Sequence, residues 1–266
     1  MIRRCYGHIT VLQTFLGFGM SPPLGFRRGR SSPDGVVMRV LFIVLRIAGV
    51  AAGVAAMVAQ LIRTYENWTD LGIQNRSGVF LNFFSFFTID SNAGAVIVFA
   101  VGAVCLIRNE GDPRWFALLR ASITSYMVVT FVVYNLLLRG IELPQGTTVP
   151  WSNEILHVVA PLLVIADWFF APGRRRLEWK DMRIIIAFPI LWVIYTLIRG
   201  PLAYNETAHK PTWYPYPFLD PSLSAEGYFS VAFYVLLIAG VVIGVGAGVI
   251  RVSRAGDRWP LPAAAA

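Results

Sequence analysis

Six long apolar stretches constrain this chain more than any other feature of its sequence. Each is long enough to cross the ~30 Å of hydrocarbon in a bilayer as a helix. We place them at residues 39–62, 83–107, 116–138, 153–171, 182–198 and 228–250. Only 14% of the residues are charged, whereas about a quarter are charged in a soluble domain. The sequence therefore predicts an all-α membrane protein with six transmembrane helices.

The distribution of basic residues predicts how these helices are oriented. Of the 23 Lys and Arg residues, 16 lie in segments on the side of the two termini and 5 lie in connections on the other side. Cytoplasmic segments retain positive charge during insertion, so both termini are expected to be cytoplasmic. The net charge of +8 then reflects topology, and we expect no nucleic-acid partner because the basic residues do not cluster with aromatic ones.

The ends of the chain are expected to lie outside the membrane domain. We divide the chain into an N-terminal tail (1–37), a six-helix transmembrane domain (38–251) and a cytoplasmic C-terminal tail (252–266). The apolar run in the tail is too short to span and lacks a small-residue cleavage site after it. Met38 directly precedes the first span, which suggests that the native protein starts there.

Arg46 and Asp167 lie within the first and fourth spans, at similar depth on the cytoplasmic side. Ionisable groups at membrane depth are costly and are often functional. We favour a structural ion pair, or snorkelling of both groups to the interface, over a functional role.

The last span carries glycines at four-residue spacing, Gly240, Gly244 and Gly248. A helix face almost without side chains lets a neighbouring helix approach closely. Packing within the chain is the interpretation we favour, and dimerisation is the alternative.

A polar stripe is expected on the second span, near its outer end. Its members are spaced by three and four residues, which places them on one face of a helix: Ser85, Thr88, Ser91 and Asn92. Asp90 is two residues from Thr88 and should point elsewhere.

His157 begins the fourth span from the same side and is the only histidine within a predicted span. It lies about one turn below the outer surface, at the depth of Thr88, so the two can meet. Pro161 cannot donate a backbone hydrogen bond to the His157 carbonyl, and a kink is expected there.

A hydroxyl and an imidazole are the minimum for nucleophilic acyl transfer, in which the base takes the hydroxyl proton. Asn92, Tyr134 and Tyr195 are the groups that we consider as oxyanion stabilisers. The alternative is structural, because threonines in transmembrane helices usually bond to their own helix and a lone histidine often only packs.

Several other chemistries lack their residues. One histidine within the spans excludes a bis-histidine haem and a zinc site with three such ligands. The chain contains no His-Glu-x-x-His, no Gly-x-Ser-x-Gly and no nucleotide-binding glycine loop. Cys5 and Cys105 are badly placed to pair. We therefore expect no metal, no cofactor and no disulfide.

Residues 199–227 form the longest external connection and contain the aromatic, proline-rich run WYPYPFLDP at 213–221. We favour an aromatic belt in the membrane interface. The alternative is a stiff segment that caps a cavity containing Thr88 and His157.

Four segments together resemble the Pr6Pr family of bacterial six-span membrane proteins. They are FFTIDSN (86–92), the run from Thr130 to Leu138, the His157–Asp167 pattern, and Arg199-Gly200 followed by WYPYPFLD (213–220). The chain is more distantly similar to the androgen-induced and androgen-dependent membrane hydrolases of animals. Those enzymes cleave fatty acid esters of hydroxy fatty acids with one intramembrane threonine and one histidine.

This second resemblance implies that Thr88 is a nucleophile and His157 its base, with Asn92 or Asp90 orienting or stabilising. The leading hypothesis is an intramembrane lipid-ester hydrolase whose substrate enters from membrane lipids. The alternative is a non-enzymatic protein, either a carrier for a small lipophilic molecule or a partner of other membrane proteins.

Overall fold

The computed structural model describes residues 33–141, 148–255 and 261, and the structural statements below concern these residues. Six helices in this part are long and apolar enough to cross a membrane. They cover Pro33–Asp70, Phe87–Ile107, Arg114–Leu138, Pro150–Phe170, Trp179–Leu202 and Tyr228–Arg254. The predicted fold class, an all-α membrane protein with six transmembrane helices, is therefore confirmed. The cytoplasmic location of the termini stays a prediction from the charges.

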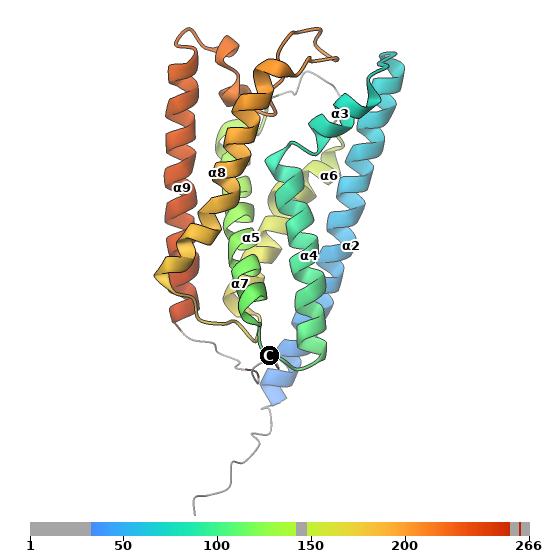
Figure 1. The fold of residues 1–266 in the computed structure, drawn as a ribbon. Coiled ribbons are helices and arrows are strands. Elements are labelled where there is room, and N and C mark those ends of the chain that lie inside the picture. Colours follow the sequence, from blue (N-terminus) through green and yellow to red (C-terminus); the bar gives the residue numbers. More distant parts are fainter. Residues whose placement is uncertain (1–32, 142–147, 256–260, 262–266) are drawn as a thin grey trace, which may run out of the picture. The chain divides into compact units, whose positions relative to one another are not determined.

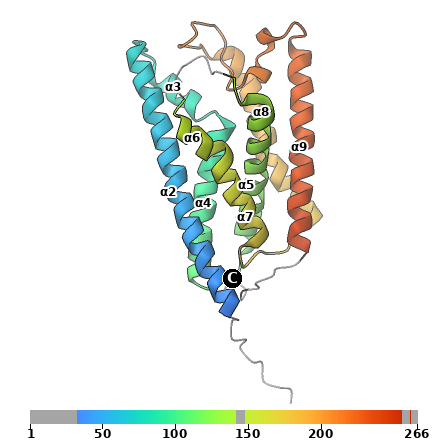
Figure 2. The ribbon, with the colours of Figure 1, turned by 180° about the vertical axis from the view of Figure 1, so that it is seen from behind.

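Helix α3 (Arg76–Phe83) precedes the second span. The spans are built from the following helices, of which some continue into one another: α2 (Pro33–Asp70), α4 (Phe87–Ile107), α5 (Arg114–Val133), η1 (Tyr134–Leu138), α6 (Pro150–Glu154), η2 (Ile155–Val159), α7 (Ala160–Phe170), η3 (Trp179–Asp181), α8 (Met182–Arg199), η4 (Gly200–Leu202) and α9 (Tyr228–Arg254). Figures 1 and 2 show α2 and α9 at opposite sides of the bundle. Helix α3 and the 203–227 connection lie at one end, which we call the loop end. The start of α2 and the end of α9 lie at the other, the terminal end.

Helix α2 is longer than the first predicted span. Its 38 residues rise ~57 Å, so it extends beyond the hydrocarbon. It begins before Met38, and the hypothesis that the native chain starts at Met38 stays a prediction. Cys5 lies outside the described residues, and Cys105 is a buried free thiol.

Helix α5 lies at the centre of the bundle and contacts α4, α7, α8 and α9. Its buried face includes small residues, among them Ala117, Ala121 and Ser125. Lipid gives little hydrophobic drive for helices to associate, so close approach through small side chains is what holds such helices together. Gly49 and Gly53 of α2 serve the same purpose against Phe99 and Val96 of α4.

The glycine face of α9 does not pack within the chain. A Cβ added to Gly240, Gly244 or Gly248 would meet nothing within 4 Å, whereas one on Gly246 would meet Met182 and Ile185. The predicted intrachain packing is therefore wrong for the first three glycines. The spacing identified a bare face correctly, but it could not tell that this face points away from the other helices.

Four buried charged residues join three helices and a connection near the terminal end. Arg46 Nε lies 2.7 Å from Asp167 Oδ1, which is the ion pair favoured from the sequence. Arg120 lies 2.9 Å from Asp167 Oδ2 and 2.6 Å from Asp112 Oδ2. The two guanidinium groups and two carboxylates balance in charge, so each charge has a partner where water is absent.

Asp167→Asn leaves two buried guanidinium groups with one carboxylate. We expect it to lower the free energy of unfolding by about 3–5 kcal/mol, because removing one partner of a buried ion pair leaves the other charge buried without a counter-charge. Thermal unfolding in detergent measures this. Glu66→Gln is the matched control, since it breaks an exposed pair with Arg63 and should cost less than ~1 kcal/mol. Equal shifts in the two variants would contradict the structural role of the buried group.

Candidate active site

The helical structure is broken directly before the second span, between α3 and α4. Helix α3 ends at Phe83 and α4 begins at Phe87, with Phe86 in an extended conformation between them (φ −76°, ψ 125°). The prediction of one continuous helix from residue 83 is therefore wrong. Ser85 lies in this break and does not share a helix face with Thr88, so the predicted polar stripe is reduced to Thr88, Ser91 and Asn92.

Side chains from α8 satisfy the polar groups that the break exposes. The Trp192 indole donates to the Ser85 carbonyl at 3.1 Å, and the Ser85 hydroxyl lies 2.9 Å from the Tyr195 hydroxyl. At membrane depth these groups cannot rely on water, so a break requires such partners. Tyr195, considered above as an oxyanion stabiliser, thus bonds to the break instead of to Thr88.

Because α4 begins at Phe87, Thr88 lies in its first turn. The backbone N–H of Thr88 has no helical acceptor there and donates to the Tyr216 hydroxyl oxygen at 3.2 Å. Thr88 Oγ1 lies 3.1 Å from His157 Nε2 and 3.2 Å from the Tyr216 hydroxyl. The structure thus brings together the two residues that sequence depth placed in one layer.

Hydrogen bonding determines which nitrogen of His157 is free to act as a base. His157 Nδ1 lies 3.0 Å from the backbone carbonyl oxygen of Asn153. A carbonyl oxygen only accepts, so Nδ1 carries the hydrogen of the neutral ring and Nε2 presents a lone pair. That lone pair faces the hydroxyl of Thr88, which is the arrangement that a general base requires.

The ring of His157 is held by a π-helical turn and by Tyr134. In η2 the Ala160 N–H bonds to the Ile155 carbonyl, five residues earlier. The irregularity expected at Pro161 is therefore a widened turn that precedes the proline. The Tyr134 ring stacks on His157 with centroids 4.1 Å apart, and Asn153 Nδ2 donates to the Tyr134 hydroxyl at 2.5 Å. Tyr134 itself begins a π-helical turn, a feature that recurs at functional sites.

Asn92 positions the site and is not aimed at a substrate. Its side-chain amide donates to the carbonyl of Thr88 at 2.9 Å and to that of Leu156 at 3.0 Å. These two bonds join the turn that carries Thr88 to the turn that carries His157. Since the amide hydrogens are engaged, Asn92 is unsuited to the role of oxyanion donor and suited to an orienting one.

Asp90 is not brought to Thr88 or His157. Among the described residues its carboxylate has no hydrogen-bond or ion-pair partner. It lies in the first turn of α4, where a negative charge is favourable beside the positive end of the helix dipole. Its charge also acts on the phenol of Tyr216, and the orienting or stabilising role given to Asp90 stays a prediction.

Tyr216 is the site residue that sequence reasoning missed. It belongs to the aromatic run of the 203–227 connection, in which Trp213 is 5% and Tyr216 8% exposed. The interpretation as an interfacial belt is wrong for these two side chains, and the capping alternative describes them. Burial raises the pKa of the Tyr216 phenol to about 12, so it keeps its proton and can donate to Thr88 Oγ1.

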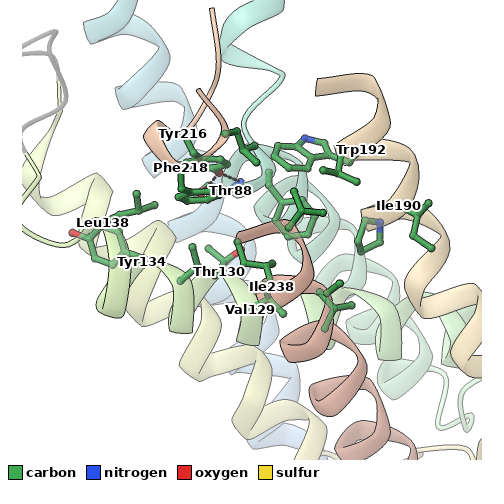
Figure 3. A pocket seen from close by; sticks show the side chains of 18 of the residues that line it. Thr88, Val129, Thr130, Tyr134, Leu138, Ile190, Trp192, Tyr216, Phe218 and Ile238 are labelled. Carbon is green, nitrogen blue, oxygen red and sulfur yellow. Dashed lines mark hydrogen bonds between the residues drawn. The ribbon is translucent and has the colours of Figure 1, made fainter. Parts of the chain in front are cut away.

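Two cavities meet at Thr88 and His157. One, of about 220 Å³, runs between α5, α8 and α9 and is lined almost wholly by apolar side chains (Figure 3). The other, of about 880 Å³, lies at the loop end and mixes polar with apolar side chains. Both are lined by Thr88, Tyr134, Leu138, His157 and Tyr216. We call the first the apolar cavity and the second the vestibule.

Comparison of the chain with family models, with curated proteins and with solved structures finds no match. The site is therefore interpreted from its own geometry. In the described part of the chain no three His, Cys, Asp or Glu side chains are grouped to hold a metal ion. The groups that the geometry offers for chemistry are the hydroxyl, the imidazole and the phenol.

The hydrogen bond to Asn153 makes a spectroscopic prediction. In protein labelled with ¹⁵N-histidine and held in micelles, at a pH where the ring is neutral, His157 should show a protonated Nδ1 and an unprotonated Nε2. His157→Gln assigns the signal among the three histidines. A neutral His157 that carries its hydrogen on Nε2 would contradict its placement as the base.

Proposed function

We propose that this multi-pass membrane protein is an intramembrane lipid-ester hydrolase in which Thr88 is the nucleophile and His157 the general base. The observation that carries the proposal is the 3.1 Å contact between Thr88 Oγ1 and the unprotonated nitrogen of His157. It lies where an apolar and a polar cavity join. An ester with a fatty chain and a polar alcohol has the same two-sided character.

In the first step His157 Nε2 takes the hydroxyl proton of Thr88 while Oγ1 attacks the ester carbonyl carbon. The bond from that carbon to the alcohol oxygen then breaks, and the imidazolium returns the proton to the departing alkoxide. In the second step His157 takes a proton from water, whose oxygen attacks the acyl carbon. The Thr88 ester bond breaks, the threonine oxygen regains a proton, and a fatty acid is released.

Negative charge on the carbonyl oxygen has donors close to Thr88. The phenol of Tyr216 lies 3.2 Å from Oγ1 and stays protonated. The start of α4 adds the positive end of a helix dipole, which favours an anion at the same place. Tyr216 replaces Asn92 and Tyr195 as the group that we assign to this role.

The non-enzymatic alternative, a carrier for a small lipophilic molecule, uses the same apolar cavity but needs no base. In such a carrier, or in a partner of other membrane proteins, the Thr88–His157 hydrogen bond would only join α4 to η2. Membership of the Pr6Pr family, the distant relation to the animal threonine hydrolases and a bacterial cell membrane are further parts of this proposal. The motifs around Thr88 and His157 support the first two, and the bacterial membrane follows from the resemblance to a bacterial family.

The direct test is ester hydrolysis by the purified protein in detergent. Thr88→Val should reduce turnover to the uncatalysed background, and His157→Gln should lower it by a factor on the order of 10²–10⁴. Thr124→Val is the matched control, because Thr124 is a buried threonine that bonds to its own helix at the Arg120 carbonyl. Full turnover in Thr88→Val or His157→Gln would show that this mechanism is wrong.

Tyr216→Phe tests the donor separately. Loss of one oxyanion donor lowers kcat by a factor on the order of 10²–10³, with a smaller effect on KM. Tyr204→Phe, at an exposed tyrosine of the same connection, should leave both constants unchanged. If Tyr216→Phe changed KM alone, the phenol would contribute to substrate binding and not to the reaction.

A further inference from the structure

We infer that the substrate is an ester of a fatty acid with a neutral, hydroxyl-rich alcohol, whose acyl chain occupies the apolar cavity and whose alcohol occupies the vestibule. This inference rests on the proposed function. It is carried by the difference between the two cavities that meet at Thr88, and above all by which charges the vestibule contains.

The vestibule is lined by groups that bind hydroxyls. Amide and hydroxyl side chains line it from α2, α3 and the connections at the loop end: Gln60, Thr64, Asn82, Thr148, Asn205 and Thr207. Several of them also bond to one another or to a neighbouring residue, as Gln60 does to Thr64 and Thr207 to Asn205. Such groups both donate and accept hydrogen bonds. They suit an alcohol that carries further hydroxyl groups, such as glycerol or a sugar.

The described side chains that line the vestibule include no cation that could pair with an anionic substrate. Among the described residues that line the vestibule, none is Lys or Arg, and Glu206 is the one carboxylate. A phosphate or carboxylate held here without a cation would lose its hydration and gain no partner.

Two arginines lie next to the vestibule, and each is bonded to a neighbouring side chain. Arg199 donates to Asn82 Oδ1 at 2.6 Å and lies over the Trp213 ring, and it does not itself line the vestibule. Arg139 is paired with Glu154 at 2.8 Å. Neither arginine is among the described residues that line the vestibule.

The apolar cavity suits the acyl chain. Along α9 it extends from Val235 to Ile243, a rise of ~12 Å. Ile190 of α8 and Ile243 of α9 both line it and are 48% and 51% exposed. The cavity therefore reaches the surface between α8 and α9, so that a chain can enter from surrounding lipid.

This substrate class differs from the one that the animal enzymes cleave. In a fatty acid ester of a hydroxy fatty acid, the alcohol part is itself a long chain that ends in a carboxylate. The vestibule would have to take both the second chain and its charge. A glycerol or sugar ester requires neither.

The experiment compares three esters with the same oleoyl chain at a pH of about 8, where carboxylates and phosphates are ionised. They are monooleoylglycerol, oleoyl lysophosphatidic acid and the oleoyl ester of hydroxystearic acid. We expect kcat/KM to favour the glycerol ester by at least about tenfold over either anionic ester, because an unpaired anion in the vestibule is costly.

Glu206→Lys reverses the charge of the wall and should raise kcat/KM for the two anionic esters relative to the glycerol ester, again by about tenfold. Glu66→Lys makes the same change at an exposed residue near the loop end that does not line the vestibule. It should leave the ratio as in the original protein.

The outcomes separate this inference from the proposed function. If Thr88 is required for hydrolysis but the anionic esters react as fast as the glycerol ester, the hydrolase proposal stands and the inference about the alcohol is overturned. That inference is overturned as well if Glu206→Lys and Glu66→Lys change the ratio equally. If none of the esters is cleaved faster than by Thr88→Val, the proposed function itself fails.

Discussion

The site depends on one constraint, that polar backbone groups at membrane depth must find partners within the protein. The break between α3 and α4 is possible because Trp192 and Tyr195 of α8 bond to Ser85. The break in turn makes Thr88 a first-turn residue. Its backbone N–H has no acceptor within the helix and donates to the Tyr216 hydroxyl instead. A continuous helix would bond that N–H internally, and the phenol would lose one of its two contacts with Thr88.

The two ends of the bundle have different roles. Towards the terminal end, ion pairs among Arg46, Asp112, Arg120 and Asp167 tie the helices together. The vestibule lies at the loop end, and the apolar cavity runs from the site between α5, α8 and α9. The side chains that face both cavities are held by helices and by hydrogen bonds to backbone, as a reactive site requires.

Much of the architecture could be predicted because it follows from one-dimensional features. Long apolar runs identify spans, and residue depth along a helix brought Thr88 and His157 to one layer before any contact was known. The Arg46–Asp167 pair followed from the same reasoning, since unpaired charges at that depth are too costly. In each case it was sufficient to compare the depths of two residues along the membrane normal.

The features that were missed depend on what another helix supplies. The break at Ser85 could not be seen because its partners come from α8, more than a hundred residues away. Tyr216 lies in an aromatic run that resembles an interfacial belt, and only its burial distinguishes it. The direction of the α9 glycine face likewise depends on how the helices pack, which sequence periodicity does not encode. The same is true of the two hydrogen bonds from Asn92 to backbone carbonyls.

The central claim is that Thr88 is a nucleophile activated by His157, and covalent labelling tests it most directly. The protein is treated with a fluorophosphonate, whose phosphorus is attacked as fluoride leaves, and the modified residue is located by peptide mass. A known membrane serine hydrolase labelled in the same detergent is the positive control. The account predicts a label on Thr88 that is lost in Thr88→Ala and in His157→Gln. Failure of the protein to label while the control is labelled, or a label on another residue that survives Thr88→Ala, would contradict it.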